Sequence, residues 1–144
     1  MRLIGFNFTK ISGKREEKQE GQVKVNHHIE IVSVDKEKID LIKEDNVLKF
    51  SFKYIVGYEP KFASIDFEGS ILLLLDDEKA KQVIKEWKKK KTPEDVRIPL
   101  FNIILSKCNV KALQLSDELG IPSHIPLPKI APGQPQQDNA EYTG

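Results

Sequence analysis

Hydrophobic and polar residues alternate along four stretches in the first half of the chain, and this alternation is typical of β-strands. The stretches cover residues 3–11, 22–34, 47–60 and 61–75. In each of them the apolar side chains gather on one face, because successive side chains of a strand point to opposite sides of the sheet. Short polar segments separate the stretches, which favours an antiparallel meander. Gly69 and Ser70 interrupt the fourth stretch and predict a β-bulge there.

The apolar spacing changes to a helical period after residue 75. Apolar residues recur at spacings of three and four, at Ala80, Val83, Ile84 and Trp87. Asp76 or Asp77 can cap this helix at its start, and a run of lysines at its end suits the helix dipole. We therefore expect a helix between residues 76 and 91.

A second, longer helix is predicted from Pro93 to Leu119. Thr-Pro-Glu is a favourable opening, Pro99 predicts an early kink, and Gly120 with Pro122 ends the helix. Its apolar residues lie on more than one face, so the helix needs a cover beyond its own sheet.

These elements predict an α+β fold with a four-stranded antiparallel sheet, arranged as a meander, and two helices packed on one face. The length suits one domain over residues 1–131. Residues 132–144 have the composition of a flexible tail.

Composition argues against several classes of protein. Charged residues make up 31% of the chain but the net charge is only +1, so no global field attracts nucleic acid or a membrane. The apolar run at residues 71–75 is far too short to span a bilayer. A single cysteine excludes an internal disulfide and fits a reducing compartment. We expect a soluble, cytoplasmic protein.

No group of residues has the pattern of a catalytic or metal site. His27 and His28 are adjacent, so a strand points them to opposite sides, and His124 stands alone. Cys108 fits a small buried side chain on the long helix better than a nucleophile. The sequence therefore predicts a protein that is not an enzyme and needs no cofactor or metal.

One cluster is strongly basic. Trp87 is followed by four consecutive lysines, Lys88, Lys89, Lys90 and Lys91. Charge beside an aromatic ring is found at nucleic-acid contacts, whereas a solvated helix end explains the same residues without a partner. Both interpretations stay open.

Four segments resemble the SecB family of export chaperones. The first is the opening strand FNFTKIS, which a long polar stretch follows, and the second is the strand FASIDFEGSILLLLDDE. The other two are the helix start RIPLFNIILSKC and the proline-rich segment GIPSHIPLPKI after the helix. In the second segment Phe62, Gly69 and Ser70 follow the family's spacing, and Asp66 departs from its apolar type. The resemblance covers residues 3–130 as an order of elements. The tail lacks the strong acidity expected for docking to the export motor, so no secretion pathway is carried over.

The resemblance implies an ATP-independent chaperone that holds unfolded or partly folded polypeptides in apolar grooves of an oligomer, a dimer or tetramer. The implied groove residues are Phe6, Phe8, Ile11, Phe50, Phe52, Ile125 and Leu127. Core packing is the alternative for the aromatic ones. The segment IPLPKI is either a groove wall or a strap across the end of the sheet. An accessory subunit of a larger assembly, associated with a ribosome or RNA, is the alternative function.

Overall fold

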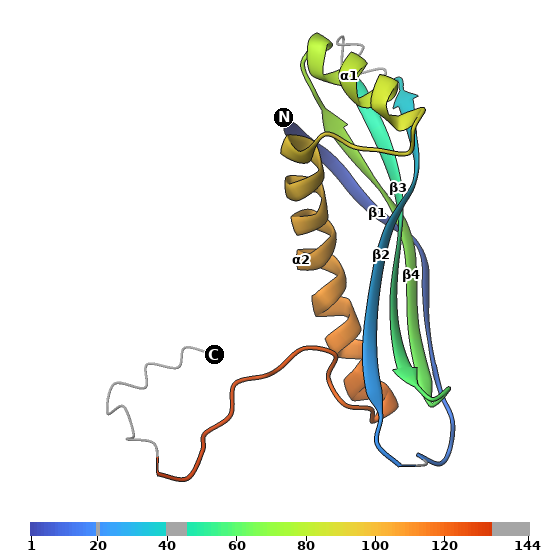
Figure 1. Cartoon of the computed structure of the whole chain (residues 1–144), viewed down its shortest axis with the longest axis vertical. Coiled ribbons are helices and arrows are strands. Elements are labelled where there is room, and N and C mark those ends of the chain that lie inside the picture. The colour runs from blue at the N-terminus through green and yellow to red at the C-terminus, as the bar shows by residue number, and fades with distance from the viewer. Residues whose placement is uncertain (20, 40–45, 134–144) are drawn as a thin grey trace.

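The protein is represented by a computed structural model that describes residues 1–19, 21–39 and 46–133. Four strands form one sheet and two helices follow them (Figure 1). The elements are β1 (Arg2–Arg15), β2 (Lys24–Glu37), β3 (Val47–Glu59), β4 (Ala63–Leu74), α1 (Asp77–Trp87) and α2 (Glu94–Leu119). Most of the predicted tail, residues 134–144, lies outside the described residues.

The four-stranded antiparallel sheet is confirmed, and its strand order is β1-β4-β3-β2. Strands β2, β3 and β4 form the predicted meander, with each strand paired to the next. Strand β1 does not pair with β2 and instead adds to the far side of β4. A tight turn would be needed to place β1 beside β2, whereas the polar stretch after β1 is long enough to pass two strands spaced about 4.8 Å apart.

One face of β3 and β4 forms the core with α2. Alternate residues along both strands are buried, and they include Phe50, Phe52, Tyr54, Ile65, Phe67 and Ile71. Helix α2 buries every fourth residue from Val96 to Ser116 against this face. The large aromatic and aliphatic side chains of the two middle strands are therefore sealed between sheet and helix.

Both predicted helices are confirmed, but the first ends four residues earlier than expected. The carboxylate of Asp76 accepts a hydrogen bond of 2.7 Å from the Lys79 amide and caps α1. Gly120 ends α2 with φ of +64°, a conformation that glycine adopts without steric cost. Helix α1 ends at Trp87, so the lysine run lies in the turn that follows it.

The predicted bulge lies on a different strand. Strand β4 continues through Gly69 without interruption, and the register shifts in β1, between Phe8 and Lys10. Gly69 allows this arrangement, because a Cβ at this position would lie 2.5 Å from the Asn7 carbonyl oxygen and 2.7 Å from Cζ of Phe52. The glycine thus marks a close approach of a neighbouring strand and ring.

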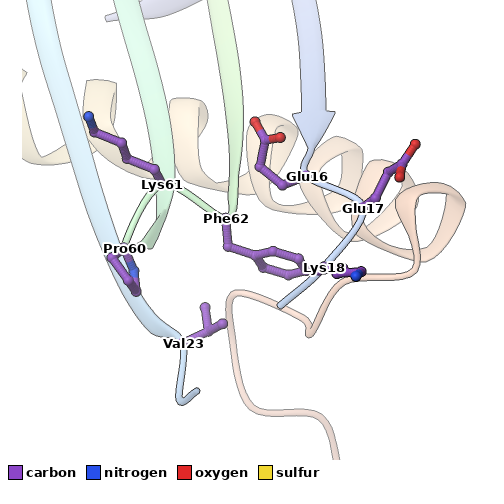
Figure 2. A pocket seen from close by; sticks show the side chains of 7 residues that line it. All are labelled: Glu16, Glu17, Lys18, Val23, Pro60, Lys61 and Phe62. Carbon is purple, nitrogen blue, oxygen red and sulfur yellow. The ribbon is translucent and has the colours of Figure 1, made fainter. Parts of the chain in front are cut away.

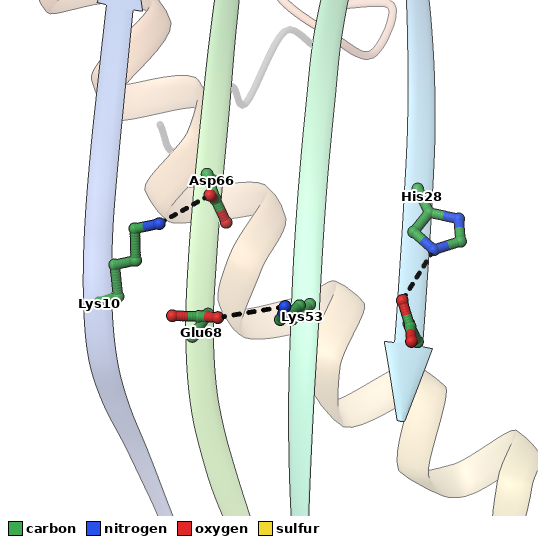
Figure 3. Close-up of polar contacts among 6 residues, drawn as sticks. Lys10, His28, Lys53, Asp66 and Glu68 are labelled. Carbon is green, nitrogen blue, oxygen red and sulfur yellow. Dashed lines mark hydrogen bonds and ion pairs between the residues drawn. The ribbon is translucent and has the colours of Figure 1, made fainter. Parts of the chain in front are cut away.

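The opposite face of the sheet is polar along its middle, whereas Ile55, Leu72 and Leu74 also point to it. Three charge pairs lie across or along its strands, and the closest joins the Lys10 ammonium to Asp66 at 2.9 Å (Figure 3). The other two pairs join Lys53 to Glu68 at 3.6 Å and His28 to Glu30 at 3.2 Å. The charged middle of this face is suited to contact with water.

We expect Gly69→Ala to destabilise the fold by about 1–3 kcal/mol, the usual cost of overpacking. The added methyl group collides with the β1 backbone and with the Phe52 ring. Gly57→Ala is the matched control, because a Cβ there meets nothing within 4 Å. Urea unfolding of the two variants checks the expectation, and equal stabilities would contradict it.

Candidate functional site

Helix α2 crosses the sheet at an angle instead of following one strand. Phe101, near its start, shares a cleft with Ile29 and Ile31 of β2. Further along, Asn109 accepts a hydrogen bond of 2.8 Å from the hydroxyl of Tyr54 on β3. At its end, Leu119 approaches Gly13 of β1. A helix on this path leaves part of each outer strand without cover.

The uncovered part of β1 carries an apolar row, which we call the β1 row. It consists of Leu3, Phe6, Phe8 and Ile11, which pair with Leu73, Ile71, Gly69 and Phe67 on the helix-facing side of β4. Leu3 and Ile11 are 44% and 46% exposed, and the two phenylalanines are half-buried. The row lies along a strand whose outer edge has no partner among the described strands.

Two irregularities in β1 create this row. Strict alternation would point Ile11 away from Phe8, because the two positions are an odd number of residues, three, apart in the sequence. The register shift between Phe8 and Lys10 restores Ile11 to the helix-facing side, and the shift between Leu3 and Gly5 does the same for Leu3. The ring of Phe6 packs edge-on against Phe8 at 5.0 Å.

Phe50 and Phe52 lie in the core, where they are 0% and 1% exposed. The ring centres of Phe52 and Phe6 are 5.5 Å apart, so Phe52 packs against the β1 row from the core side. These two phenylalanines therefore occupy the core position that the sequence left open as an alternative, and they contribute no open surface.

Residues 121–130, which we call the post-helix segment, follow α2, and their first four residues close the uncovered corner on the β2 side. The hydroxyl of Tyr58 donates a 2.7 Å hydrogen bond to the Pro122 carbonyl. His124 is buried, and its ring meets His27 of β2 edge-on at 5.0 Å. Arg15 fixes the start of the segment by donating to the carbonyls of Leu119 and Gly120, both at 3.1 Å.

The exposure of this segment increases beyond His124. Ile125 is half-buried and Leu127 is 51% exposed. These two residues follow the buried His124 on the post-helix segment, whereas Phe6, Phe8 and Ile11 lie on β1, at the edge of the sheet opposite β2. The candidate residues therefore form two separate apolar surfaces within one chain.

Apart from these two surfaces, a hollow lies at the end of the sheet where β3 turns into β4. It encloses about 530 Å³ between the residues that follow β1 and the β3–β4 turn (Figure 2). Glu16, Glu17, Lys18 and Lys61 line it together with Val23 and Phe62. Its charged lining suits water better than an apolar ligand.

The four lysines after α1 are exposed. Only Lys90 has a defined aromatic contact, with its ammonium 4.9 Å from the centre of the Trp87 ring. The contact of this cluster with nucleic acid stays a prediction.

The other titratable candidates are accounted for by packing. Cys108 is buried on the sheet-facing side of α2, and this burial raises the pKa of its thiol to about 12. Among the described residues, no three histidine, cysteine or acidic side chains are placed to hold a metal ion. Within the same residues no helix has the length and apolar character that crossing a membrane requires.

Sequence reasoning missed Leu3 and Phe101 as surface candidates, and it placed Trp87 only beside the lysine run. Strict alternation assigns Leu3 and Phe6 to opposite faces, and only the register shift after Leu3 places them on the same face. Phe101 and Trp87 satisfy the helical period of a core face, and only the path of α2 leaves them at the border of a cleft with β2. The low segregation of apolar residues around α2 was the available signal.

The buried His124 predicts a pH-dependent stability. Asn109 Oδ1 accepts from both Tyr54 and His124 Nε2, at 2.8 and 3.0 Å, so we assign the proton to Nε2. The Nδ1 atom has no partner among the described residues. Burial, together with the nearby His27, lowers the pKa of His124 to about 4, below its ordinary value of about 6.5.

The unfolded chain therefore takes up this proton first as the pH falls. We expect the free energy of unfolding to decline as the pH falls from 6.5 to about 4. The slope of this decline reflects up to about one more proton bound to His124 in the unfolded chain than in the folded one. His124→Gln removes that contribution, whereas His28→Gln, a change on the open polar face, leaves it. Urea unfolding across this pH range measures the slopes, and identical slopes for the wild type and His124→Gln would contradict the expectation.

Comparison with known proteins supports the fold. No family model matches the sequence, and no curated protein matches it. A structure search finds the Mycobacterium tuberculosis Rv1957 SecB-like chaperone, solved in complex with a ChAD peptide from the Rv1956 HigA1 antitoxin. The alignment has a TM-score of 0.53 and 13% sequence identity, and it covers 90% of this chain and 87% of that chain. The chain therefore resembles SecB-like proteins, in an α+β fold with a four-stranded antiparallel sheet and two helices.

Proposed function

We propose that this protein is a SecB-like chaperone that holds non-native polypeptides without an energy source. The observation that supports the proposal best is the β1 row, an apolar surface beside an unpaired strand edge. The structural neighbour is a SecB-like chaperone bound to a peptide, and its fold covers most of this chain.

An extended polypeptide fits such a surface chemically. Its backbone can donate to and accept from the free edge of β1, and alternate side chains then meet Phe6, Phe8 and Ile11. Burial of apolar surface contributes roughly 25 cal/mol per Å² and requires no particular side chain. A surface of this kind binds many sequences weakly, as a holding chaperone requires. Ile125 and Leu127 on the post-helix segment provide a second apolar contact.

We further propose that the chain assembles into a dimer or tetramer. Helix α2 exposes Ile98 and Val110 on the side away from the sheet, at 50% and 67%. Ile103 and Leu105 are half-buried and lie seven residues from Val110 and Ile98, so two apolar stripes run along the exposed surface of the helix. A second copy placed on this surface would remove it from water.

The chaperone proposal predicts that the protein suppresses aggregation of a thermally unfolded test protein at near-stoichiometric amounts and without ATP. Light scattering of several unrelated test proteins measures this protection. An absence of protection for all of them rules the proposal out.

The double variant Ile125→Ser and Leu127→Ser tests the second contact. We expect it to lose at least about half of the protection, because two apolar contacts with the client are removed. Ile130→Ser is the matched control, since Ile130 lies on the same segment and is 87% exposed. If the control loses as much protection as the double variant, the assigned residues are wrong.

The assembly proposal predicts a solution mass of two or four chains by light scattering. The double variant Ile98→Glu and Val110→Glu should lower this mass, because it places charges on the apolar outer surface of α2. The double variant Asn102→Glu and Ser106→Glu adds the same charge at exposed polar positions of that helix and serves as the control. A monomer mass for the wild type contradicts the proposal.

A further inference from the structure

We propose that the cleft between β2 and the start of α2 binds an extended polypeptide segment that carries acidic side chains. The cleft encloses about 520 Å³, and we call it the β2 cleft. This inference rests on the proposed polypeptide binding and adds a charge preference at a surface separate from the β1 row.

The wall of the β2 cleft combines apolar residues from three elements. Ile29 and Ile31 come from β2, Trp87 from the end of α1, and Phe101 from α2. All four side chains are half-buried, so each keeps surface that a bound chain can cover. Their separation in the sequence shows that the cleft exists only in the folded protein.

Two cations stand at the border of this apolar wall. Lys90 and Arg97 both line the cleft, and both side chains are exposed. Neither forms an ion pair with another described residue. Glu30 also borders the cleft, but it alternates with Ile29 and Ile31, so its side chain points to the opposite face of the sheet, where it contacts His28 Nε2 at 3.2 Å. The charge left for a ligand is therefore positive, which complements aspartate or glutamate.

The backbone holds Lys90 in place. Its φ is +57°, a conformation that residues other than glycine rarely adopt. Hydrogen bonds from the amides of Lys90 to Trp87 and of Lys91 to Glu86 close the turn around it, at 2.8 and 3.2 Å. In this turn the ammonium lies over the Trp87 ring and at the cleft. A cation fixed beside an apolar wall suits a ligand that carries both characters.

The free edge of β2 favours an extended peptide as the occupant. Strand β2 is the last of the sheet, so alternate residues present backbone donors and acceptors outward. Its register with β3 is regular from Lys24 to Ile31 and shifts before Ser33. A chain added along the regular part points every second side chain toward α2, where the cleft lies.

Nucleic acid fits this cleft less well. The Trp87 ring already has Lys90 over it, so this face is not free for a base. Of the four lysines after α1, only Lys90 lines the cleft. A phosphate backbone is recognised by a track of cations, whereas here two cations flank an aliphatic and aromatic wall.

The experiment compares two fluorescein-labelled peptides of about eight residues, matching the regular part of β2. Both are rich in valine and threonine, and one carries two aspartates where the other carries two lysines. Fluorescence anisotropy measures their affinity for the full chain. The cleft variant is Lys90→Glu with Arg97→Glu. Its control is Lys88→Glu with Lys89→Glu, which changes the net charge equally at exposed positions that do not line the cleft.

We expect the wild type to bind the aspartate peptide at least about tenfold more tightly than the lysine peptide, a difference typical of a well-placed ion pair. The cleft variant should lose this preference, and the control should keep it within about twofold. Circular dichroism verifies that both variants are folded.

Equal affinity of the wild type for the two peptides overturns the inference. So does an equal loss of preference in the cleft variant and the control, since that result shows a general charge effect. A third outcome also overturns the inference: a single-stranded RNA probe binds the wild type and no longer binds the cleft variant, while the peptide affinities are unchanged. That result would assign the cleft to nucleic acid.

The aggregation assay on the same wild-type preparation separates this inference from the proposed function. Protection of test proteins without a charge preference leaves the chaperone proposal standing and removes the acidic-ligand proposal. A charge preference at the cleft without any protection of test proteins leaves the acidic-ligand proposal standing and removes the chaperone proposal.

Discussion

A single helix crossing a four-stranded sheet sets the main constraint on this structure. The outer strands of such a sheet lie about 14 Å apart, whereas a helix with its side chains is only about 10–12 Å wide. Helix α2 therefore seals β3 and β4, whose inward side chains include the fully buried Phe50, Tyr54 and Phe67. It cannot cover the full length of β1 or β2. The apolar surface that remains at these two edges follows from this geometry.

The chain treats its two edges differently. On β2, the post-helix segment returns after Gly120 and covers one corner through Tyr58, His124 and His27. On β1, no described element covers the row from Leu3 to Ile11, and two register shifts keep its apolar side chains turned inward. One corner of the β2 edge is thus covered by the chain itself, whereas the β1 edge keeps the open surface on which the proposed chaperone function depends.

The candidate site could be predicted from the sequence only in part. The alternation around Phe6 and Phe8 indicates an apolar strand face, and residues 121–130 stand out by their prolines. Phe50 and Phe52 have the same pattern as Phe6 and Phe8, yet they are buried, because they belong to a middle strand and the others to an edge strand. A period-two pattern records which face a residue occupies and contains no information on the position of its strand in the sheet.

The sequence by itself determined the local elements: four strands by alternation, two helices by their period, the Asp76 cap and the Gly120 stop. These features depend on residues close together in the chain, so they can be read from it. The tertiary structure decided that β1 pairs with β4, that Gly69 accepts the Phe52 ring, and that Trp87 and Phe101 meet β2 at one cleft. Each of these depends on contacts between residues distant in the chain, where steric fit selects one arrangement among several that the same pattern allows.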